Sequence, residues 1–395
     1  MRPSILVPGL CMLAAPVAGQ STISSYPLRA RAPAQWTVLA RPILEIGGES
    51  ATGPTEFTKV VGVARLTSGT IVVADGTSRE LRAFDSQGRF VKRYTRKGNG
   101  PGELPWLDAM TMVGDTMVVI DGRRAVHVFA PDGSWRTSLV LPAVPGYIVN
   151  PAIGALNGSD AVIKLRAGSL GSVRQDSVWL ARISLRDTSV RIFGAQPLPP
   201  TFSARPGGPA PYALGFAPYT LAAVTPRRVC LAHSERYEIS CLDSLGKTVV
   251  VIRRELAAMT VSDSARRAYR FVKSGRRPDG SSRYEGTLRA HRERVAAAAR
   301  FAASYPAISQ LLIAHSGELW VRRYVPEDGL SESPWRSNAV PSEWSIYDRQ
   351  GRWIADCRLP ARFAPGDIGR DYVLGVSQDD DDLERVIMLR LTADR

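Results

Sequence analysis

The sequence predicts an all-β chain folded as a six-bladed β-propeller, and two observations favour that fold. A strand-and-turn unit repeats with a nearly constant period, because Asp75 and Asp121 are 46 positions apart and Phe84 and Phe129 are 45 apart. Each unit also holds about four short strands separated by tight turns, which is typical of one propeller blade. The 34 glycines and 28 prolines suit a chain that turns so often.

The repeat is clearest in its first two copies. Thr70–Gly76 is followed by Glu80–Asp85, and Thr116–Gly122 is followed in the same way by Val126–Phe129. In both copies an apolar strand ends in Asp-Gly, and a second strand ends in phenylalanine before another turn. Short apolar runs bounded by such turns indicate strands with both faces buried.

Four further units carry the pattern to the C-terminus. The third is weaker, whereas the fourth aligns with the first without a gap, since the spacing from His233 to Asp243 equals that from Asp75 to Asp85. We expect a strand pair in each of the later units near Ala161, Arg228, Gly317 and Asp371.

The last unit is one strand short. A ring with a missing outer strand has open edges, which invite aggregation. Pro42–Ile46 precedes the first unit and is a strand with no partner so far. We therefore predict that this N-terminal strand closes the last blade, so that residues 36–395 form a single ring.

Several motifs carry a resemblance to a known family. Together they resemble the bacterial six-bladed β-propeller family that is related to NHL-repeat proteins. The resemblance implies the fold over nearly the whole chain, but no particular activity. The motifs are Leu66–Gly69, Ile71–Asp75, Phe84-Asp85 with Gly88, Gly98–Glu103 and Asp371–Val376.

The N-terminus predicts export. Residues 1–20 have a basic start, an apolar run from Ile5 to Val17 and a small-residue end, which is the pattern of a secretory signal peptide. Residues 21–35 are expected to be a flexible segment. No later stretch is long and apolar enough for a membrane span. We therefore expect a periplasmic or extracellular protein.

Every long insertion is expected on one rim of the propeller. If the strands of a blade are numbered from the axis outward, the first-to-second and third-to-fourth turns are short throughout. The second-to-third loops and the connections between blades include 167–176, 195–214, 255–304 and 325–341. Because loops on a rigid scaffold carry function, this rim is the predicted working face.

A helical hairpin is predicted between blades 4 and 5, at about 255–305. Ser262 or Asp263 can cap a helix that runs to about Lys273, and a second helix follows over 284–303. From 262 to 300 the chain has eleven Arg or Lys and four Asp or Glu, a net of +7 against a formal charge of +14 for the whole chain. The hairpin is interpreted either as a basic lid for an anionic ligand or as a solvated hairpin that covers apolar edges. The lid residues are Arg266, Arg267, Arg270, Arg289 and Arg292.

Polar residues end the second strand of successive blades on this same rim. A ring of such side chains could hold a ligand, and Glu103 could reach the same channel from a glycine-rich crossover. A Ca²⁺ ion was considered, but two arginines in the ring oppose a bare metal cage, so no metal or cofactor is predicted. The alternative is that Asp75 and Asp121 only start turns by accepting backbone hydrogen bonds. The candidate ligand-binding residues are Asp75, Glu103, Asp121, Arg166, His233 and Arg323.

The cysteines give one local prediction. The gapless alignment places Cys230 and Cys241 opposite each other on neighbouring antiparallel strands, within disulfide range. An exported protein would meet an oxidising compartment. The pair is therefore either a disulfide or two buried thiols, and Cys357 stays free.

No catalytic motif was found, and among the four histidines only His233 has a predicted rim position. The leading hypothesis is a non-catalytic binding or scaffold module, whose partner is an unknown protein or an anionic small molecule or polymer. We expect the protein to be a monomer and not to bind nucleic acid. The alternative is a propeller hydrolase or lyase with its site at the axial channel, so enzyme activity stays open.

Overall fold

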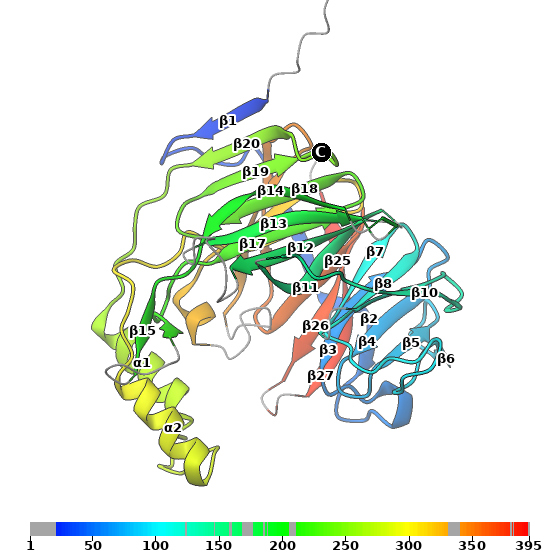
Figure 1. The fold of residues 1–395 in the computed structure, drawn as a ribbon, viewed down its shortest axis with the longest axis horizontal. Helices are drawn as coiled ribbons and strands as arrows, with labels where there is room; N and C mark the ends of the chain where they lie inside the picture. Colours follow the sequence, from blue (N-terminus) through cyan, green and yellow to red (C-terminus); the bar gives the residue numbers. More distant parts are fainter. Residues whose placement is uncertain are drawn as a thin grey trace, which may run out of the picture.

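The computed structural model describes residues 21–122, 125–145, 147–157, 160–167, 177–184, 186–187, 189–204, 211–330, 340–379, 381 and 383–393. Figure 1 shows a molecule built almost wholly of twisted sheets, with one helical hairpin projecting from them. The predicted all-β class is confirmed.

Three sheets have four strands each, joined in chain order by antiparallel pairing. The first holds β3 (Val60–Arg65), β4 (Ile71–Asp75), β5 (Glu80–Phe84) and β6 (Phe90–Arg93). The second holds β7 (Ala109–Val113), β8 (Thr116–Asp121), β9 (Ala125–Phe129) and β10 (Trp135–Val140). The third holds β11 (Tyr147–Asn157), β12 (Asp160–Ala167), β13 (Ser177–Ser184) and β14 (Val190–Pro197).

A fourth sheet has five strands because an N-terminal strand joins it. It holds β17 (Thr220–Thr225), β18 (Arg228–His233), β19 (Glu238–Leu242) and β20 (Thr248–Arg254), with β1 (Thr22–Tyr26) parallel to β20. β1 lies within the segment 21–35, for which the sequence analysis expected flexibility. The outer edge of β20 offers unpaired backbone groups, and β1 satisfies them.

The remaining large sheet has eight strands, and β2 (Gln35–Gly47) joins its two halves. One half holds β21 (Ile308–Ile313), β22 (Leu319–Arg323), β23 (Ser342–Tyr347) and β24 (Trp353–Leu359), and the other holds β25 (Phe363–Ile368), β26 (Tyr372–Gln378) and β27 (Glu384–Thr392). Gln35 and Trp36 pair with β24, after which β2 runs antiparallel to β27. Pro42 lies opposite Leu389 and Ile46 opposite Val386, which is the pairing that the sequence predicted.

The first strand of each sheet lies on the inside of the arrangement. β3 contacts β7, β7 contacts β11, β11 contacts β17 and β17 contacts β21, while β25 returns to contact β3. The sheets therefore follow one another around a common centre in a propeller-like arrangement.

The core lies between neighbouring sheets. All of β4 is buried, as its continuous apolar sequence predicted, because sheets cover both of its faces. Val63 and Ile71, for example, pack against Leu374 and Val386 of the next sheet. The outer strand β6 is mostly exposed and carries Lys92 and Arg93 at its edge, where charge discourages pairing with another chain.

Cys230 and Cys241 form a disulfide inside the fourth sheet, which is one of the two alternatives that the sequence left open. Cys230 in β18 lies directly opposite Cys241 in β19, in the register that Val72 and Ala83 share in the first sheet. Cys357 is a buried free thiol, and burial raises its pKa to about 12.

Two helices and three short elements complete the described chain. α1 (Asp263–Ser274) begins at the predicted cap, because the Ser262 side chain accepts from the Ala265 N–H, and it ends at Gly275 with a φ of 76°. α2 is shorter than predicted and spans Gly286–Ala297. The other elements are a two-stranded ladder of β15 (Thr201–Ser203) with β16 (Pro211–Ala213), and two 3-10 turns, η1 (Gly53–Thr55) and η2 (Pro326–Gly329).

Candidate functional site

Asp75 and Asp121, the two aspartates predicted on the rim, are buried, and their carboxylates contact residues that are nearby in the sequence. Oδ1 of Asp75 accepts hydrogen bonds from the N–H groups of Thr77 and Ser78, at 2.9 and 3.1 Å, while its Oδ2 accepts from Thr58. Asp121 is 1 % exposed, and its Oδ2 lies 3.7 Å from Nε2 of His127. For Asp75 this geometry matches the turn-forming alternative.

Glu103 is engaged within its own crossover loop. Its carboxylate accepts from the Gly100 N–H at 2.9 Å and pairs with Arg96 at 2.7 Å. These contacts hold the pKa of Glu103 below its ordinary value, with the backbone hydrogen bond from Gly100 as the largest cause. Arg166 lies near the end of β12, opposite Val178, and is exposed.

His233 and Arg323 end β18 and β22, in neighbouring sheets. Nδ1 of His233 lies 3.7 Å from Oε2 of Glu235, and burial lowers the pKa of His233. Arg323 is about half exposed and lies 3.7 Å from Glu343. Of the six predicted residues, Arg323 lines the pocket described next and the other five are not part of its lining.

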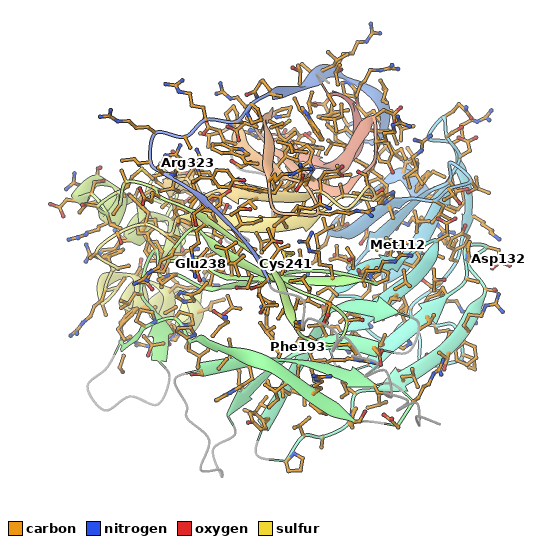
Figure 2. The ribbon with its side chains drawn as sticks, turned by 90° about the horizontal axis from the view of Figure 1, so that it is seen from above. Met112, Asp132, Phe193, Glu238, Cys241 and Arg323 are labelled. Atoms are coloured by element: carbon orange, nitrogen blue, oxygen red, sulfur yellow. A yellow bond between two sulfur atoms is a disulfide. The ribbon has the colours of Figure 1, made fainter. Side chains whose placement is uncertain are left out.

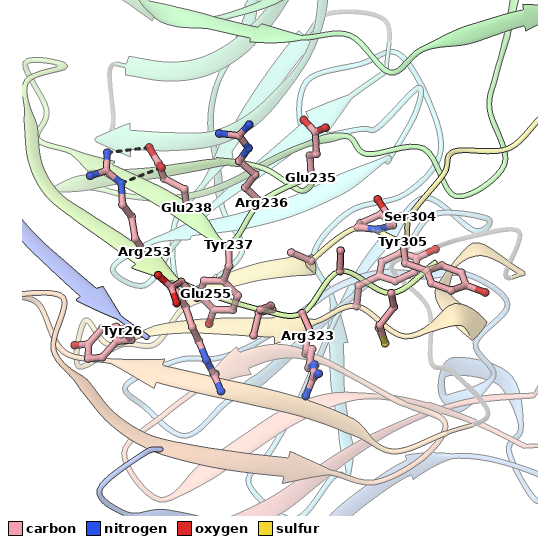
Figure 3. A pocket seen from close by; sticks show the side chains of 18 of the residues that line it. Tyr26, Glu235, Arg236, Tyr237, Glu238, Arg253, Glu255, Ser304, Tyr305 and Arg323 are labelled. Atoms are coloured by element: carbon pink, nitrogen blue, oxygen red, sulfur yellow. Dashed lines mark hydrogen bonds and ion pairs between the residues drawn. The ribbon is translucent and has the colours of Figure 1, made fainter. Parts of the chain in front are cut away.

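That pocket, which we call the rim pocket, has a volume of about 610 Å³ and lies between the β17–β20 sheet and β21–β22. Figure 3 shows Tyr26 and Tyr305 on opposite sides of it, and Figure 2 shows Glu238 and Arg323 on one side of the molecule, away from Met112. It is lined by Ser25–Pro27, Glu235–Glu238, Arg253–Met259, Ser304–Ala307, Arg323 and Tyr324.

Backbone hydrogen bonds connect the segments around the rim pocket. The N–H of Ala307 donates to Ser234 at 2.7 Å, and the N–H of Glu255 donates to Tyr26 at 2.9 Å. The N–H of Tyr305 donates to the carbonyl of Met259 at 2.9 Å. This bond pairs the segment that leads into the helical hairpin with the segment that leads out of it. The pocket walls are therefore parts of a connected framework.

Arg254 and Tyr237 line the rim pocket, and side chains outside the lining contact both of them. Cζ of Arg254 lies 4.0 Å from the centre of the Trp353 ring, and its Nη1 donates to Ser345 at 2.9 Å. Tyr237 is buried and accepts a hydrogen bond from the hydroxyl of Tyr347 at 2.9 Å. Burial raises the pKa of Tyr237 to about 12, so its hydroxyl stays neutral. The lining thus places the ring of Tyr237 beside the positive charge of Arg254.

The charges at the pocket edge are only partly paired. Glu238 accepts two hydrogen bonds from Arg253, at 2.9 and 3.4 Å, as the dashed lines in Figure 3 show. Oε2 of Glu255 accepts from the N–H of Leu28 at 3.3 Å. Among the described residues, Arg323 pairs only with the exposed Glu343, at the longer distance of 3.7 Å. Such a pocket suits a molecule with both an apolar part and an anionic group.

The predicted basic residues divide into two groups on the hairpin. Arg266 and Arg270 lie over Phe301, at 5.9 and 4.9 Å from the ring centre, and Arg292 lies 4.9 Å from that of Tyr284. Arg289 pairs with Glu293 at 3.4 Å, whereas Arg267 is exposed. Three of the five thus pack on the hairpin's own aromatic rings.

A second group of titratable side chains lies at the opposite ends of the inner strands. Nε2 of His315, in the turn after β21, lies 2.6 Å from Oδ1 of Asp367 in β25. Oδ2 of Asp367 accepts from the Tyr372 hydroxyl at 3.1 Å and from the Arg65 N–H at 2.9 Å. Asp367 is 8 % exposed, while the His315 side chain is 52 % exposed. A buried carboxylate thus orients an accessible imidazole.

Electrostatics favour the charged form of this histidine. The hydrogen bond that His315 donates to Asp367 is the largest cause that raises the pKa of His315, burial opposes it, and the charge of Asp115 adds to the rise. If the carboxylate accepts from Nε2, the lone pair of the neutral ring lies on Nδ1. We call these two residues the axial dyad.

Sequence reasoning missed the axial dyad because it assigned His315 only to a short turn. The contact depends on two different inner strands meeting at one end, where the His315 N–H also donates to the carbonyl of Ile368 at 2.9 Å. A usable signal was present, since His315 and Asp367 each stand at the end of the first strand of consecutive units.

Two further findings bear on the site. Among the residues that the structure describes, no group of three His, Cys, Asp or Glu is placed to hold a metal ion. No helix within those ranges is long and apolar enough to cross a membrane.

Comparisons with known proteins address the fold. No family model matches this chain, and no curated protein matches it in sequence. A member of the DUF4221 family from Bacteroides vulgatus aligns with 91 % of this chain and 99 % of its own, at 10 % identity and a TM-score of 0.51. The chain has a propeller-like fold.

Other structures align with lower scores. A Bacteroides fragilis protein named as exported covers 95 % of this chain and 100 % of its own, at 12 % identity and a TM-score of 0.48. Regucalcin from Agrobacterium tumefaciens, named as a calcium-binding protein, covers 95 % and 98 %, at 12 % identity and a TM-score of 0.39. At these values neither match transfers a function to this propeller-like chain.

Proposed function

We propose that this chain is an exported, six-bladed β-propeller that binds a ligand or a partner at the rim pocket. The blade count rests on six four-stranded units: the first three sheets, β17–β20, β21–β24, and β25–β27 completed by β2. β2 is the outermost strand of the sixth unit, so an N-terminal strand completes the unit that the C-terminal strands β25–β27 begin. This pairing connects the N-terminal and C-terminal parts of the chain.

Export is supported by two independent features. The Cys230–Cys241 disulfide requires an oxidising compartment, and the first twenty residues have the composition of a signal peptide. We infer that the protein works in the periplasm or outside the cell.

The observation that carries the binding function is the rim pocket. It lies on the face where the long insertions emerge, and its volume of about 610 Å³ is in the range of small-molecule sites. Tyr237 and Arg254 in its lining give ring surface beside a cation, and Arg323 can receive an anionic group. We propose a ligand that combines an aromatic or apolar part with a carboxylate or phosphate.

A ligand screen that compares the wild type with a variant whose rim pocket is filled tests this proposal. Ligand-observed NMR against a library of aromatic carboxylates would compare the wild-type chain with Ala258→Trp, which places an indole in the rim pocket. Compounds that bind the wild type should lose binding in this variant. Ser86→Trp fills a separate hollow beside β2 and is the matched control. Hits that bind both variants equally would contradict the rim pocket as the binding site.

The axial dyad favours a second candidate function, an enzyme of the hydrolase or lyase kind with its site at the axis. Asp367 would orient His315, and Nδ1 of His315 would take a proton from water or from a substrate. In ester hydrolysis the resulting hydroxide forms a bond to the carbonyl carbon. The imidazolium then returns the proton to the leaving oxygen as the ester bond breaks.

Turnover of 4-nitrophenyl acetate tests this second function. General-base catalysis of about a hundredfold should be lost in His315→Ala and largely lost in Asp367→Asn. His291→Ala, on the hairpin, is the control for unspecific reaction at a surface imidazole. Equal rates in all four proteins would leave the axial dyad with a structural role only.

A further inference from the structure

The helical hairpin has a fixed base and a distal end that projects into solvent. At its base Phe216, Tyr269, Phe301 and Tyr305 pack on one another, with ring centres 5.1–6.0 Å apart. The N–H of Val261 also donates to Ala303 at 3.0 Å. Figure 1 shows α1 and α2 extending away from the sheets. The distal end is the loop 275–285 with the adjacent helical turns.

Exposed cations lie at this distal end, where Arg277 and Arg283 are in the loop, and also along α1, where Arg267 stands one turn before Phe271. Arg267, Arg277 and Arg283 are exposed, and no described carboxylate lies within ion-pair distance of their guanidinium groups. Arg276 and Arg289 share a single partner, Glu293, and remain more than half exposed. The loop 275–285 holds Arg276, Arg277 and Arg283 against Asp279 and Glu285, so the distal end carries a net positive charge.

Two large apolar side chains are exposed at the same end. Phe271 lies in the last turn of α1 and is 44 % exposed, and Leu288 lies in the first turn of α2 and is 49 % exposed. Because the helices are joined by the loop 275–285, these two turns are next to each other. Single exposed apolar residues are common, but an aromatic and a leucine among unpaired arginines are typical of segments that rest on a membrane surface.

We propose that the distal end of the hairpin docks on an anionic phospholipid surface. Arg267, Arg277 and Arg283 would contact lipid phosphates, while Phe271 and Leu288 enter the boundary between head groups and acyl chains. An anionic polymer would use the same arginines, but it offers no apolar layer for Phe271 and Leu288. Lipid is therefore the partner that accounts for both kinds of side chain. This surface is separate from the rim pocket.

Co-sedimentation with vesicles tests the proposal. The full chain should bind vesicles of phosphatidylglycerol and phosphatidylcholine, and binding should weaken as salt rises and with pure phosphatidylcholine. Arg267→Glu, Arg277→Glu and Arg283→Glu together should weaken binding by about a hundredfold or more, since each basic residue near such a surface contributes about 1 kcal/mol. Phe271→Ser with Leu288→Ser should weaken it by about tenfold.

The matched control reverses three exposed arginines outside the hairpin, Arg136, Arg186 and Arg227. This variant has the same net charge as the hairpin variant and should bind within about twofold of the wild type. Circular dichroism of each variant checks that the fold is retained. Failure of the wild type to bind anionic vesicles overturns the proposal. Full binding by the Phe271/Leu288 variant, together with loss in the arginine variant, would instead assign the surface to a soluble polyanion.

Discussion

Nε2 of His315 lies 2.6 Å from Oδ1 of Asp367, and the Tyr372 hydroxyl donates to the other oxygen of the same carboxylate. This arrangement fixes the direction of an imidazole that is half exposed at the end of the inner strands. The first two predictions concern this contact.

The pKa of His315 should be above that of an ordinary histidine. Asp367→Asn removes the charge that stabilises the imidazolium, and burial then dominates, so the pKa of His315 should fall. NMR titration of the ring protons measures it. An unchanged pKa of His315 would show that the contact is absent in solution.

The same contact should make stability depend on pH in a defined direction. Because the folded pKa of His315 is raised, its contribution is fully present below the unfolded pKa and is lost as pH rises through the folded value. His315→Gln should therefore lower the free energy of unfolding more at about pH 5.5 than at about pH 9. Urea denaturation at both pH values gives the comparison, and a larger loss at the higher pH would contradict it.

The closing strand β2 should contribute strongly to stability through one face only. Ile46 is 3 % exposed and packs in the core, whereas Ile43 is 49 % exposed. Ile46→Ala should lower the free energy of unfolding by about 2–5 kcal/mol, and Ile43→Ala by under about 0.5 kcal/mol. Chemical denaturation compares them. Equal effects would mean that β2 does not pair with β27 in the register observed here.

Removing the disulfide should destabilise the chain by restoring freedom to its unfolded state. Cys230 and Cys241 are 11 residues apart and both are fully buried. Cys230→Ala with Cys241→Ala should lower the free energy of unfolding by about 2–4 kcal/mol. Thiol titration of the denatured, unreduced chain without residues 1–20 should find one free thiol, Cys357. Three thiols would exclude the disulfide.

Removing one partner of a buried ion pair near the rim pocket should lower the free energy of unfolding strongly. Arg322 donates to Oδ1 of Asp328 at 2.8 Å, and Oδ2 accepts from the Val325 N–H at 3.1 Å. Asp328→Ala leaves an uncompensated buried charge and should cost about 3–5 kcal/mol. Arg322→Met with Asp328→Leu should recover part of that loss. A double variant no better than the single one would indicate that the hydrogen bond to Val325 dominates.

Much of the architecture could be predicted because it depends on local patterns. The run Ile71–Asp75 forms a buried strand, and Cys230 lies opposite Cys241, since both follow from strand period and hairpin register. The pairing of Pro42–Ile46 followed from the need to complete an edge. In contrast, β1 was not predicted, because Thr22–Tyr26 has no strong pattern of its own and becomes a strand by pairing with β20.

The sequence by itself determined the strand units, their order and the place of the basic hairpin, because repeat spacing and turn chemistry act over a few residues. Only the tertiary structure decided which side chains meet. It buried Asp75 and Asp121, formed the rim pocket from segments as distant as Tyr26 and Arg323, and brought His315 to Asp367. The physical reason is that contacts between sheets depend on how the inner strands converge, and no local pattern in the chain records that convergence.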